Sequence, residues 1–277
     1  MPTPAAQHGA ARRPAGRITR GTTAPNRLRR VDRWLVGPAA GPLRGAADPF
    51  VVDLGYGASA TTPRELLHRL RAVRPDVEVL GLEIDPARVA SAREQLAADP
   101  EPALSFALGG FEVPTSARLP VVLRAFNVLR QYDEHEVGGV WERLRSRLAP
   151  GGVLVDGTCD ELGRRAAWVA LDAATGPVSL TVSVRLAGLE RPSDVAERLP
   201  KALIHRNVPG EGVHAALAEL DAAWDRSAPM ASFGARQRWI AACAGLRERG
   251  WPVLDGPARW RLGELTLAWQ AVAPRTG

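Results

Sequence analysis

The chain of 277 residues is 45% hydrophobic and 24% charged, which suits one large folded domain with or without an appendage. No apolar run approaches the roughly 18 residues that a membrane-spanning helix needs, and no apolar stretch follows the first methionine, so we expect neither membrane insertion nor a secretory signal. The net charge of +6 comes almost entirely from arginine, since Lys201 is the single lysine, and a GC-rich coding sequence explains this bias better than a nucleic-acid partner does.

The first 48 residues predict little regular structure apart from one helix. Residues 1–17 are Pro, Ala, Gly and Arg with little to bury, which predicts a disordered leader. Residues 18–48 predict a basic arm, in which Asn26 caps a helix before a Gly- and Pro-rich loop. The apolar face of this helix consists of Leu28, Val31, Trp34 and Leu35.

From Pro49 onward, short apolar segments alternate with segments of helical period. The predicted strands are 50–54, 77–84, 103–108, 119–129 and 153–158, and the predicted helices are 63–73, 85–96 and 134–148. Asp85 is a suitable N-cap for the middle helix because Pro86 follows at the first helical position. This alternation predicts an α/β core over residues 49–186, with a mostly parallel sheet covered by helices on both faces.

After Thr158 the pattern changes to antiparallel strands and then to helices. Residues 166–172 and 178–186 predict two strands joined by a hairpin-length turn. In the second of these, Ser179, Thr181 and Ser183 alternate with apolar residues, so we expect one solvent-exposed face. Residues 187–277 predict a helical C-terminal elaboration with a final strand over 263–272, on the substrate side.

The segment VVDLGYG, residues 51–57, carries the strongest chemical signal. Asp53 ends the first predicted strand, and Gly55 and Gly57 follow before a helix. Ligands of open parallel sheets bind beyond the carboxyl ends of the strands, where glycine lets backbone N–H groups approach them. Asp53 would repel a pyrophosphate but suits a cationic ligand such as S-adenosylmethionine. Glu83, at the end of the second strand, can accept both hydroxyls of a ribose at the same sheet edge.

Because of these residues, the sequence resembles the class I S-adenosylmethionine-dependent methyltransferases over about residues 49–160. VVDLGYG is similar to their glycine-rich first motif and GLEIDPARV to their acidic strand end. LRAFNVLRQY is similar to their fourth-strand motif, and LAPGGVLVDGT to the segment that follows it. The resemblance implies a Rossmann-like sheet of seven strands, the last antiparallel, and S-adenosylmethionine as the cofactor.

The resemblance also implies a set of cofactor contacts. These are Asp53, Gly55, Tyr56, Gly57, Glu83, Ile84, Gly110, Phe111, Arg124 and Asn127. Within this set, the Asp53–Gly57 turn would line the methionine end, Glu83 would hold the ribose, and residues 109–112 would lie by the adenine. An acidic residue usual in the family at that last position is Gly or Phe here. Arg124 and Asn127 would face the methyl donor.

The methyl acceptor is unidentified. Asn127 and His205 are the candidate catalytic residues, His205 because it lies among Lys201, Arg206, Asn207 and His214 on a segment that would form either a substrate lid or a solvated loop. The strand end AFNVLRQY lacks the Asn/Asp-Pro-Pro-Tyr/Phe signature used on exocyclic base amines. The two cysteines, Cys159 and Cys243, form no metal cluster and no evident disulfide pair, so we expect no metal and a cytoplasmic setting.

Three interpretations of function remain open. A small-molecule acceptor is slightly favoured, because the sequence contains no recognisable RNA-binding module. RNA is the second candidate acceptor, with Arg27, Arg29, Arg30 and Arg33 of the basic arm as phosphate contacts. The alternative for this arm is that Arg20, Thr22, Thr23 and Asn26 close over the cofactor. A non-catalytic cofactor-binding or partner-binding protein of the same fold is the third. A nicotinamide-dependent oxidoreductase is disfavoured by Asp53, and the sequence predicts no membrane partner and no particular oligomeric state.

Overall fold

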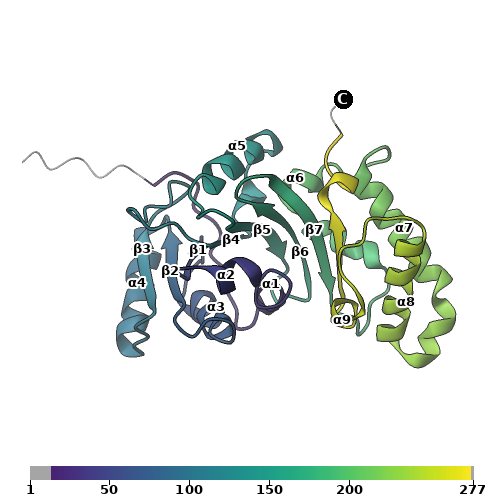
Figure 1. Cartoon of the computed structure of the whole chain (residues 1–277), viewed down its shortest axis with the longest axis horizontal. Coiled ribbons are helices and arrows are strands. Elements are labelled where there is room, and N and C mark those ends of the chain that lie inside the picture. The colour runs from purple at the N-terminus through teal and green to yellow at the C-terminus, as the bar shows by residue number, and fades with distance from the viewer. Residues whose placement is uncertain (1–13, 276–277) are drawn as a thin grey trace, which may run out of the picture.

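The computed structural model describes residues 14–275, which form one eight-stranded sheet with helices on both faces (Figure 1). The strand order is β3-β2-β1-β4-β5-β6-β7-β8. The strands are β1 Phe50–Leu54, β2 Glu78–Glu83, β3 Leu104–Leu108, β4 Val122–Phe126, β5 Val153–Cys159, β6 Arg165–Asp172, β7 Gly176–Val184 and β8 Glu264–Ala268. The predicted α/β core is thus confirmed, with each predicted strand present within a few residues of its expected bounds.

Strands β1 to β5 are parallel, and β6, β7 and β8 each pair antiparallel with the strand before them in the sheet. The sheet therefore has eight strands, where the family resemblance implied seven with only the last antiparallel. The reason is local: three residues join β6 to β7, and five join β5 to β6. A parallel connection needs a crossover of a dozen or more residues, so these short links permit only hairpins.

Helices cover the sheet in two layers. The α-helices are α1 Arg29–Leu35, α2 Gly41–Gly45, α3 Thr61–Leu70, α4 Pro86–Ala98, α5 Glu134–Arg145, α6 Lys201–Ile204, α7 Gly212–Arg226, α8 Ala235–Glu248 and α9 Pro257–Trp260. The 3₁₀ helices are η1 Leu129–Gln131, η2 Pro192–Arg198, η3 Ala228–Phe233 and η4 Trp269–Ala271. Hydrophobic residues of α1 to α4 pack on one face, and those of α5 to α8 form a second core on the other.

The two predicted helix caps have different outcomes. Asp85 caps α4 as predicted, since its carboxylate accepts a hydrogen bond from Ala87 N at 2.9 Å. Asn26 does not cap α1, whose N-cap is Leu28. Asn26 has φ +60°, a left-handed conformation that Asn tolerates, and its carboxamide accepts from Arg69 Nη2 at 2.7 Å instead.

The polar face predicted to be solvent-exposed on β7 is buried. Ser179, Thr181 and Ser183 are at most 5% exposed. The expectation was wrong because other segments cover this face: Arg30 of α1 donates to Ser183 Oγ at 2.9 Å, and Thr181 Oγ1 lies 2.9 Å from Thr266 Oγ1 on β8. The hydroxyl groups of Thr181 and Ser183 therefore have hydrogen-bond partners within the protein and do not require contact with water.

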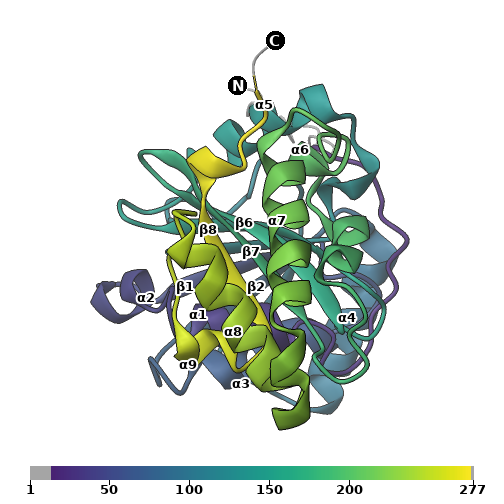
Figure 2. The same cartoon turned by 90° about the vertical axis from the view of Figure 1, so that its right-hand side faces the viewer.

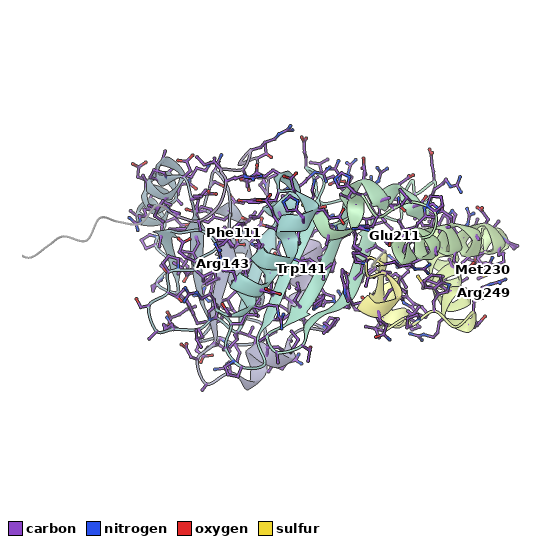
Figure 3. The ribbon with its side chains drawn as sticks, turned by 90° about the horizontal axis from the view of Figure 1, so that it is seen from above. Phe111, Trp141, Arg143, Glu211, Met230 and Arg249 are labelled. Atoms are coloured by element: carbon purple, nitrogen blue, oxygen red, sulfur yellow. The ribbon has the colours of Figure 1, made fainter. Side chains whose placement is uncertain are left out.

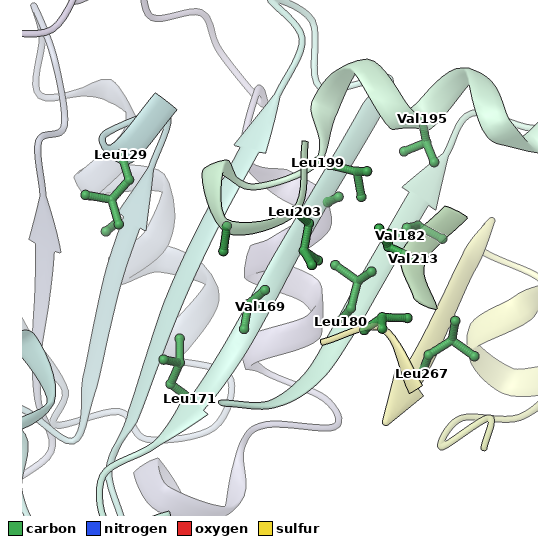
Figure 4. Close-up of a cluster of buried hydrophobic side chains, with 14 of the residues drawn as sticks. Leu129, Val169, Leu171, Leu180, Val182, Val195, Leu199, Leu203, Val213 and Leu267 are labelled. Atoms are coloured by element: carbon green, nitrogen blue, oxygen red, sulfur yellow. The ribbon is translucent and has the colours of Figure 1, made fainter. Parts of the chain in front are cut away.

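The C-terminal helices attach to the β7–β8 edge, and Figure 2 shows α7 and α8 side by side there. In Figure 4, strand residues such as Val169 and Val182 gather with Leu199, Leu203 and Val213 from the segments that follow. Figure 3 shows Met230 and Arg249 at the end of the molecule away from Phe111. Most of the C-terminal elaboration therefore lies away from the predicted cofactor residues.

The N-terminal segment is placed from residue 14 onward. Residues 1–13, most of the predicted leader, lie outside the described residues. Residues 14–17 are held against the fold, since Ala15 O accepts from Phe111 N at 2.8 Å and Arg17 N donates to the Tyr132 hydroxyl. No helix in residues 14–275 combines the length and the apolar character that crossing a membrane requires.

Candidate active site

The carboxylate of Asp53, at the end of β1, is paired with an arginine from the neighbouring strand. Asp53 and Arg124 face one another across the β1–β4 pair. Arg124 donates from Nε to Asp53 Oδ1 at 2.9 Å and from Nη2 to Oδ2 at 2.6 Å. Its Nη1 contacts Asp32 of α1, and Arg69 of α3 donates to the other Asp32 oxygen at 2.6 Å. Arg69 also contacts Glu65 at 3.3 Å, so two arginines and three carboxylates form one chain of ion pairs.

Arg124 lies beneath the site and does not face a ligand. Its side chain is fully buried and belongs to the wall of neither cavity described below. Burial alone lowers the pKa of a guanidinium, but the carboxylates of Asp53 and Asp32 outweigh it and raise the pKa of Arg124, which stays charged. The prediction that Arg124 faces the methyl donor is corrected accordingly: it holds Asp53 in place.

Glu83 and the glycine turn meet as predicted. Gly55 and Gly57 have φ of +69° and +90°, values that L side chains rarely adopt. Gly57 N donates to Glu83 Oε2 at 3.1 Å, and Ile84 N donates to Oε1 at 2.9 Å. The Glu83 side chain is 1% exposed, with Arg88 Nη1 at 3.6 Å from Oε2. These contacts fix the carboxylate at the sheet edge, next to the turn that follows β1.

A cavity of about 470 Å³ opens beyond the carboxyl ends of β1, β4 and β5. Five predicted site residues line it: Asp53, Gly55, Tyr56, Gly57 and Asn127. Segments from four parts of the chain complete the wall, namely residues 19–28, η1, the β5–β6 connection and the end of η2. We call this the first cavity.

A second cavity of about 20 Å³ adjoins the first, because Thr19, Leu54 and Gly55 line both. Its wall contains the remaining predicted cofactor residues apart from Arg124, namely Glu83, Ile84, Gly110 and Phe111. The two cavities thus bring together the residues predicted for the methionine end and those predicted for the nucleoside.

The N-terminal segment, residues 14–23, accounts for the small size of the second cavity. Ala58 N donates to Gly21 O at 3.0 Å, and Arg88 Nη2 donates to Thr19 O at 2.7 Å. A Cβ on Gly110 would lie only 2.0 Å from Ala15 O. The donors and apolar walls of the second cavity fit a nucleoside, but a space of one water molecule does not, so an adenosine requires this segment to shift.

Asn127 lines the first cavity, but its side chain also makes hydrogen bonds within the fold. It has φ +58°, its Oδ1 accepts from Cys159 N at 3.0 Å, and its Nδ2 lies 3.4 Å from Cys159 Sγ. The side chain therefore ties the end of β4 to the end of β5. Burial raises the pKa of the Cys159 thiol, which lines the same cavity.

His205 is not brought to either cavity. It lies on a separate shallow surface with Lys201 and Arg206, and its Nε2 is 3.0 Å from Lys201 Nζ. Arg206 is paired with Glu134 and Glu211 rather than with the cavity. The predicted lid of residues 198–214 therefore contributes only Arg198 to the first cavity, and the acid–base role predicted for His205 has no support in this geometry.

Sequence reasoning missed two of the four arginines that line the first cavity, Arg130 and Arg198. The other two, Arg20 and Arg27, were predicted to close over the cofactor and to contact RNA phosphates, respectively. The Arg124–Asp53 pair was missed as well, although a signal existed: an arginine inside the apolar strand VLRAF requires a buried countercharge. No comparable local signal marks Arg130 and Arg198, because they come from segments far apart in the chain.

A parallel sheet in the order β3-β2-β1-β4-β5, with a glycine turn after β1 and a carboxylate after β2, defines a Rossmann-like methyltransferase fold. No family model matches the sequence. A curated trans-aconitate 2-methyltransferase from Methylobacterium radiotolerans is 38% identical over 109 residues. The chain thus has the fold of the class I S-adenosylmethionine-dependent methyltransferases and is similar in sequence to one curated methyltransferase over 109 residues.

The match to this relative covers 39% of the chain and 37% of the relative. Among solved structures, the CcbJ methyltransferase from Streptomyces caelestis is 22% identical with a TM-score of 0.36, over 58% of this chain and 66% of that one. The glycopeptide N-methyltransferase MtfA is 19% identical with a TM-score of 0.36, over 46% and 51% of the two chains.

Proposed function

We propose that this protein transfers a methyl group from S-adenosylmethionine to a small-molecule acceptor. One observation carries the proposal: the glycine turn after β1 and the buried Glu83 carboxylate meet at one sheet edge, beside two adjoining cavities. When bound, S-adenosylmethionine supplies an electrophilic methyl carbon on a sulfonium.

Different residues of the chain would bind different parts of S-adenosylmethionine. The Gly55–Gly57 turn lines the first cavity, where the methionine end would lie close to the backbone, while the N–H groups of Gly55 and Gly57 donate to Leu82 O and Glu83 Oε2. Glu83 would accept the ribose hydroxyls, and Ile84 and Phe111 would enclose the adenine with apolar surface. Asp53 would contribute less to an ammonium than an unpaired carboxylate does, since Arg124 already neutralises it. Positioning of donor and acceptor then supplies much of the rate.

A small acceptor is favoured over RNA because Arg27 and Arg30 of the Arg-rich arm donate hydrogen bonds within the fold. Arg27 Nε donates to Asp160 O at 3.1 Å, and Arg30 donates to Gly163 O and Ser183 Oγ, both at 2.9 Å. Burial lowers the pKa of Arg30 to about 10. The curated relative is also named for a small acid, trans-aconitate.

The test is calorimetric titration of the purified chain with S-adenosylmethionine and with S-adenosylhomocysteine. We expect micromolar binding by wild type and at least tenfold weaker binding by Glu83→Gln. Glu78→Gln is the matched control, because Glu78 begins the same strand at its opposite, exposed end. Asp53→Ala is a poor probe, since it would leave the buried Arg124 without its main partner and confound binding with folding.

Failure of folded wild type to bind either compound would sink the proposal. It would favour the non-catalytic alternative instead. Equal losses in Glu83→Gln and Glu78→Gln would place the nucleoside elsewhere.

A further inference from the structure

Four arginine side chains line the first cavity. Arg20 comes from the N-terminal segment, Arg27 from the turn before α1, Arg130 from η1 and Arg198 from the end of η2. Three parts of the chain, namely residues 19–28, η1 and η2, thus place four guanidinium groups on the wall of the 470 Å³ cavity.

These charges are not neutralised by the protein. Within residues 14–275, Arg20, Arg27 and Arg130 have no carboxylate within 4.0 Å. Arg198 approaches Glu197 Oε1 at 3.5 Å, but Arg165 holds that same oxygen at 2.9 Å. Arg124 differs, since it is fully buried beneath the cavity and contacts two carboxylates, whereas Arg20 and Arg130 are exposed.

Two of the four guanidinium groups are also held in place. Arg27 donates to the carbonyls of Asp160 and Thr22, and Arg130 Nη1 donates to Glu197 O at 3.0 Å. Partial burial lowers the pKa of Arg130, and the nearby positive charges of Arg198 and Arg20 lower it further. Like charges held this close repel one another, and a bound anion relieves the repulsion.

The same wall offers little to accept a proton. No histidine lines it among the described residues, the Asp53 carboxylate is held by Arg124, and the Cys159 thiol is buried. The remaining acid is the exposed Glu161. A carboxylate acceptor requires no base, because it is already deprotonated at neutral pH.

We propose that the acceptor is a small polycarboxylate, bound by Arg20, Arg27, Arg130 and Arg198 and methylated on a carboxylate oxygen. This rests on the function proposed above. An acceptor oxygen forms the new C–O bond while the C–S bond of the sulfonium breaks and its electron pair goes to sulfur. The methylated carboxylate becomes an uncharged ester group, the sulfonium becomes an uncharged thioether, and no proton is released. Planar guanidinium groups bind carboxylates bidentately, which leaves one carboxylate free to point at the donor.

The first experiment measures anion binding by calorimetry, with citrate titrated into the protein with and without saturating S-adenosylhomocysteine. We expect sub-millimolar citrate binding that weakens at high salt, and at least a tenfold loss in Arg130→Gln/Arg198→Gln. Arg143→Gln is the control, since Arg143 is an exposed arginine of α5 outside the cavity wall. Affinity for S-adenosylhomocysteine should change less than threefold in every variant.

Three results would overturn the proposal. One is absent citrate binding by protein that binds S-adenosylhomocysteine. Another is a parallel loss of S-adenosylhomocysteine binding in the double variant, which would make these arginines contacts of the cofactor carboxylate. The third is inorganic phosphate binding more tightly than citrate. Citrate binding without any S-adenosylhomocysteine binding would instead show an anion site on a protein that is not a methyltransferase.

The second experiment tests the acceptor atom. Methyl-labelled S-adenosylmethionine is incubated with a mixture of citrate, isocitrate, tricarballylate and succinate. We expect label that mild alkali releases as methanol, as methyl esters do. Alkali-stable label, or no transfer by protein that binds the cofactor, would reject methylation of a small polycarboxylate.

Discussion

At the scale of single residues, the site depends on charges whose partners lie on other strands. Arg124 stands in the middle of a fully buried strand, where an unpaired guanidinium would be prohibitively unfavourable. Asp53 from β1 and Asp32 from α1 supply the countercharge. The carboxylate that the sequence offers as a ligand for a cation is therefore also a structural ion.

Replacing Arg124 with Met should destabilise the fold by about 3–5 kcal/mol, because Asp53 and Asp32 would remain buried without a countercharge. Arg118→Met is the matched control, since Arg118 also contacts two carboxylates, Asp48 and Glu78, but is 40% exposed. Its loss should be about 1 kcal/mol or less. Urea unfolding measures both. Equal losses would show that the Arg124 pairs contribute no more than surface pairs.

The buried carboxyl group of Asp156 should make the free energy of unfolding depend on pH. Burial raises the pKa of its carboxyl to about 7 from an ordinary 3.8, although the hydrogen bond from Trp141 Nε1 at 3.0 Å opposes the rise. The native state therefore holds a proton that the unfolded state releases. The stability this proton contributes is complete below pH 4 and is lost as the pH rises through 7.

Between pH 5 and pH 8 the free energy of unfolding of wild type should fall by about 2 kcal/mol relative to Asp156→Asn. Asp172→Asn is the control, since backbone N–H groups lower the pKa of Asp172 and its titration is complete below pH 5. Chemical denaturation at the two pH values tests this. A constant difference between wild type and Asp156→Asn would mean that Asp156 is ionised in the native protein.

At the scale of elements, the N-terminal segment is an added layer across the carboxyl edge of the sheet. It approaches Gly57 and Gly110 so closely that only glycine fits: a Cβ on Gly57 would lie 3.0 Å from Gly21 O. Thr19 of this segment lines both cavities, and Arg20 lines the first cavity. Since it covers the space predicted for the adenosine, its displacement should accompany cofactor entry.

Gly110→Ala should loosen this segment, because the new Cβ would meet Ala15 O at 2.0 Å. We expect trypsin to cleave after Arg17 and Arg20 severalfold faster, with little change in overall stability. Gly139→Ala is the control: Gly139 lies in α5 with open space around it, and alanine there should stabilise the helix by about 0.5–1 kcal/mol. An unchanged cleavage rate in Gly110→Ala would show that the segment does not pack as described.

At the scale of the whole molecule, the C-terminal helices and the sheet share one core. β8 comes from the end of the chain and pairs with β7, and the larger hydrophobic cluster runs from the β1 side of the sheet through α7 and α8. The C-terminal elaboration thus supplies the last strand of the sheet and shares its core. Its one contribution to the first cavity is Arg198, held by the contact of Thr158 Oγ1 with Arg198 O.

Trp239→Ala should destabilise the entire chain by about 3–5 kcal/mol, since Trp239 is fully buried and packs against Trp224. Because the core is shared, circular dichroism and tryptophan fluorescence should report one coincident transition in wild type and variant. Phe233→Ala, at a 71% exposed position, should change stability by about 0.5 kcal/mol or less. Separate transitions would show that residues 187–275 fold independently of the sheet.

The sequence by itself determined the alternation of strands and helices, the Asp85 cap, the glycine turn and the acidic end of β2. Each depends on residues close together in the chain or on one β-α-β unit, so local periodicity and backbone preferences suffice. Tertiary structure alone decided that Arg124 neutralises Asp53, that Ser183 is buried under Arg30, and that His205 stands apart from the cavity. It also decided that four arginines meet around one space. Those outcomes depend on which distant segments become neighbours, and the local sequence pattern does not specify those neighbours.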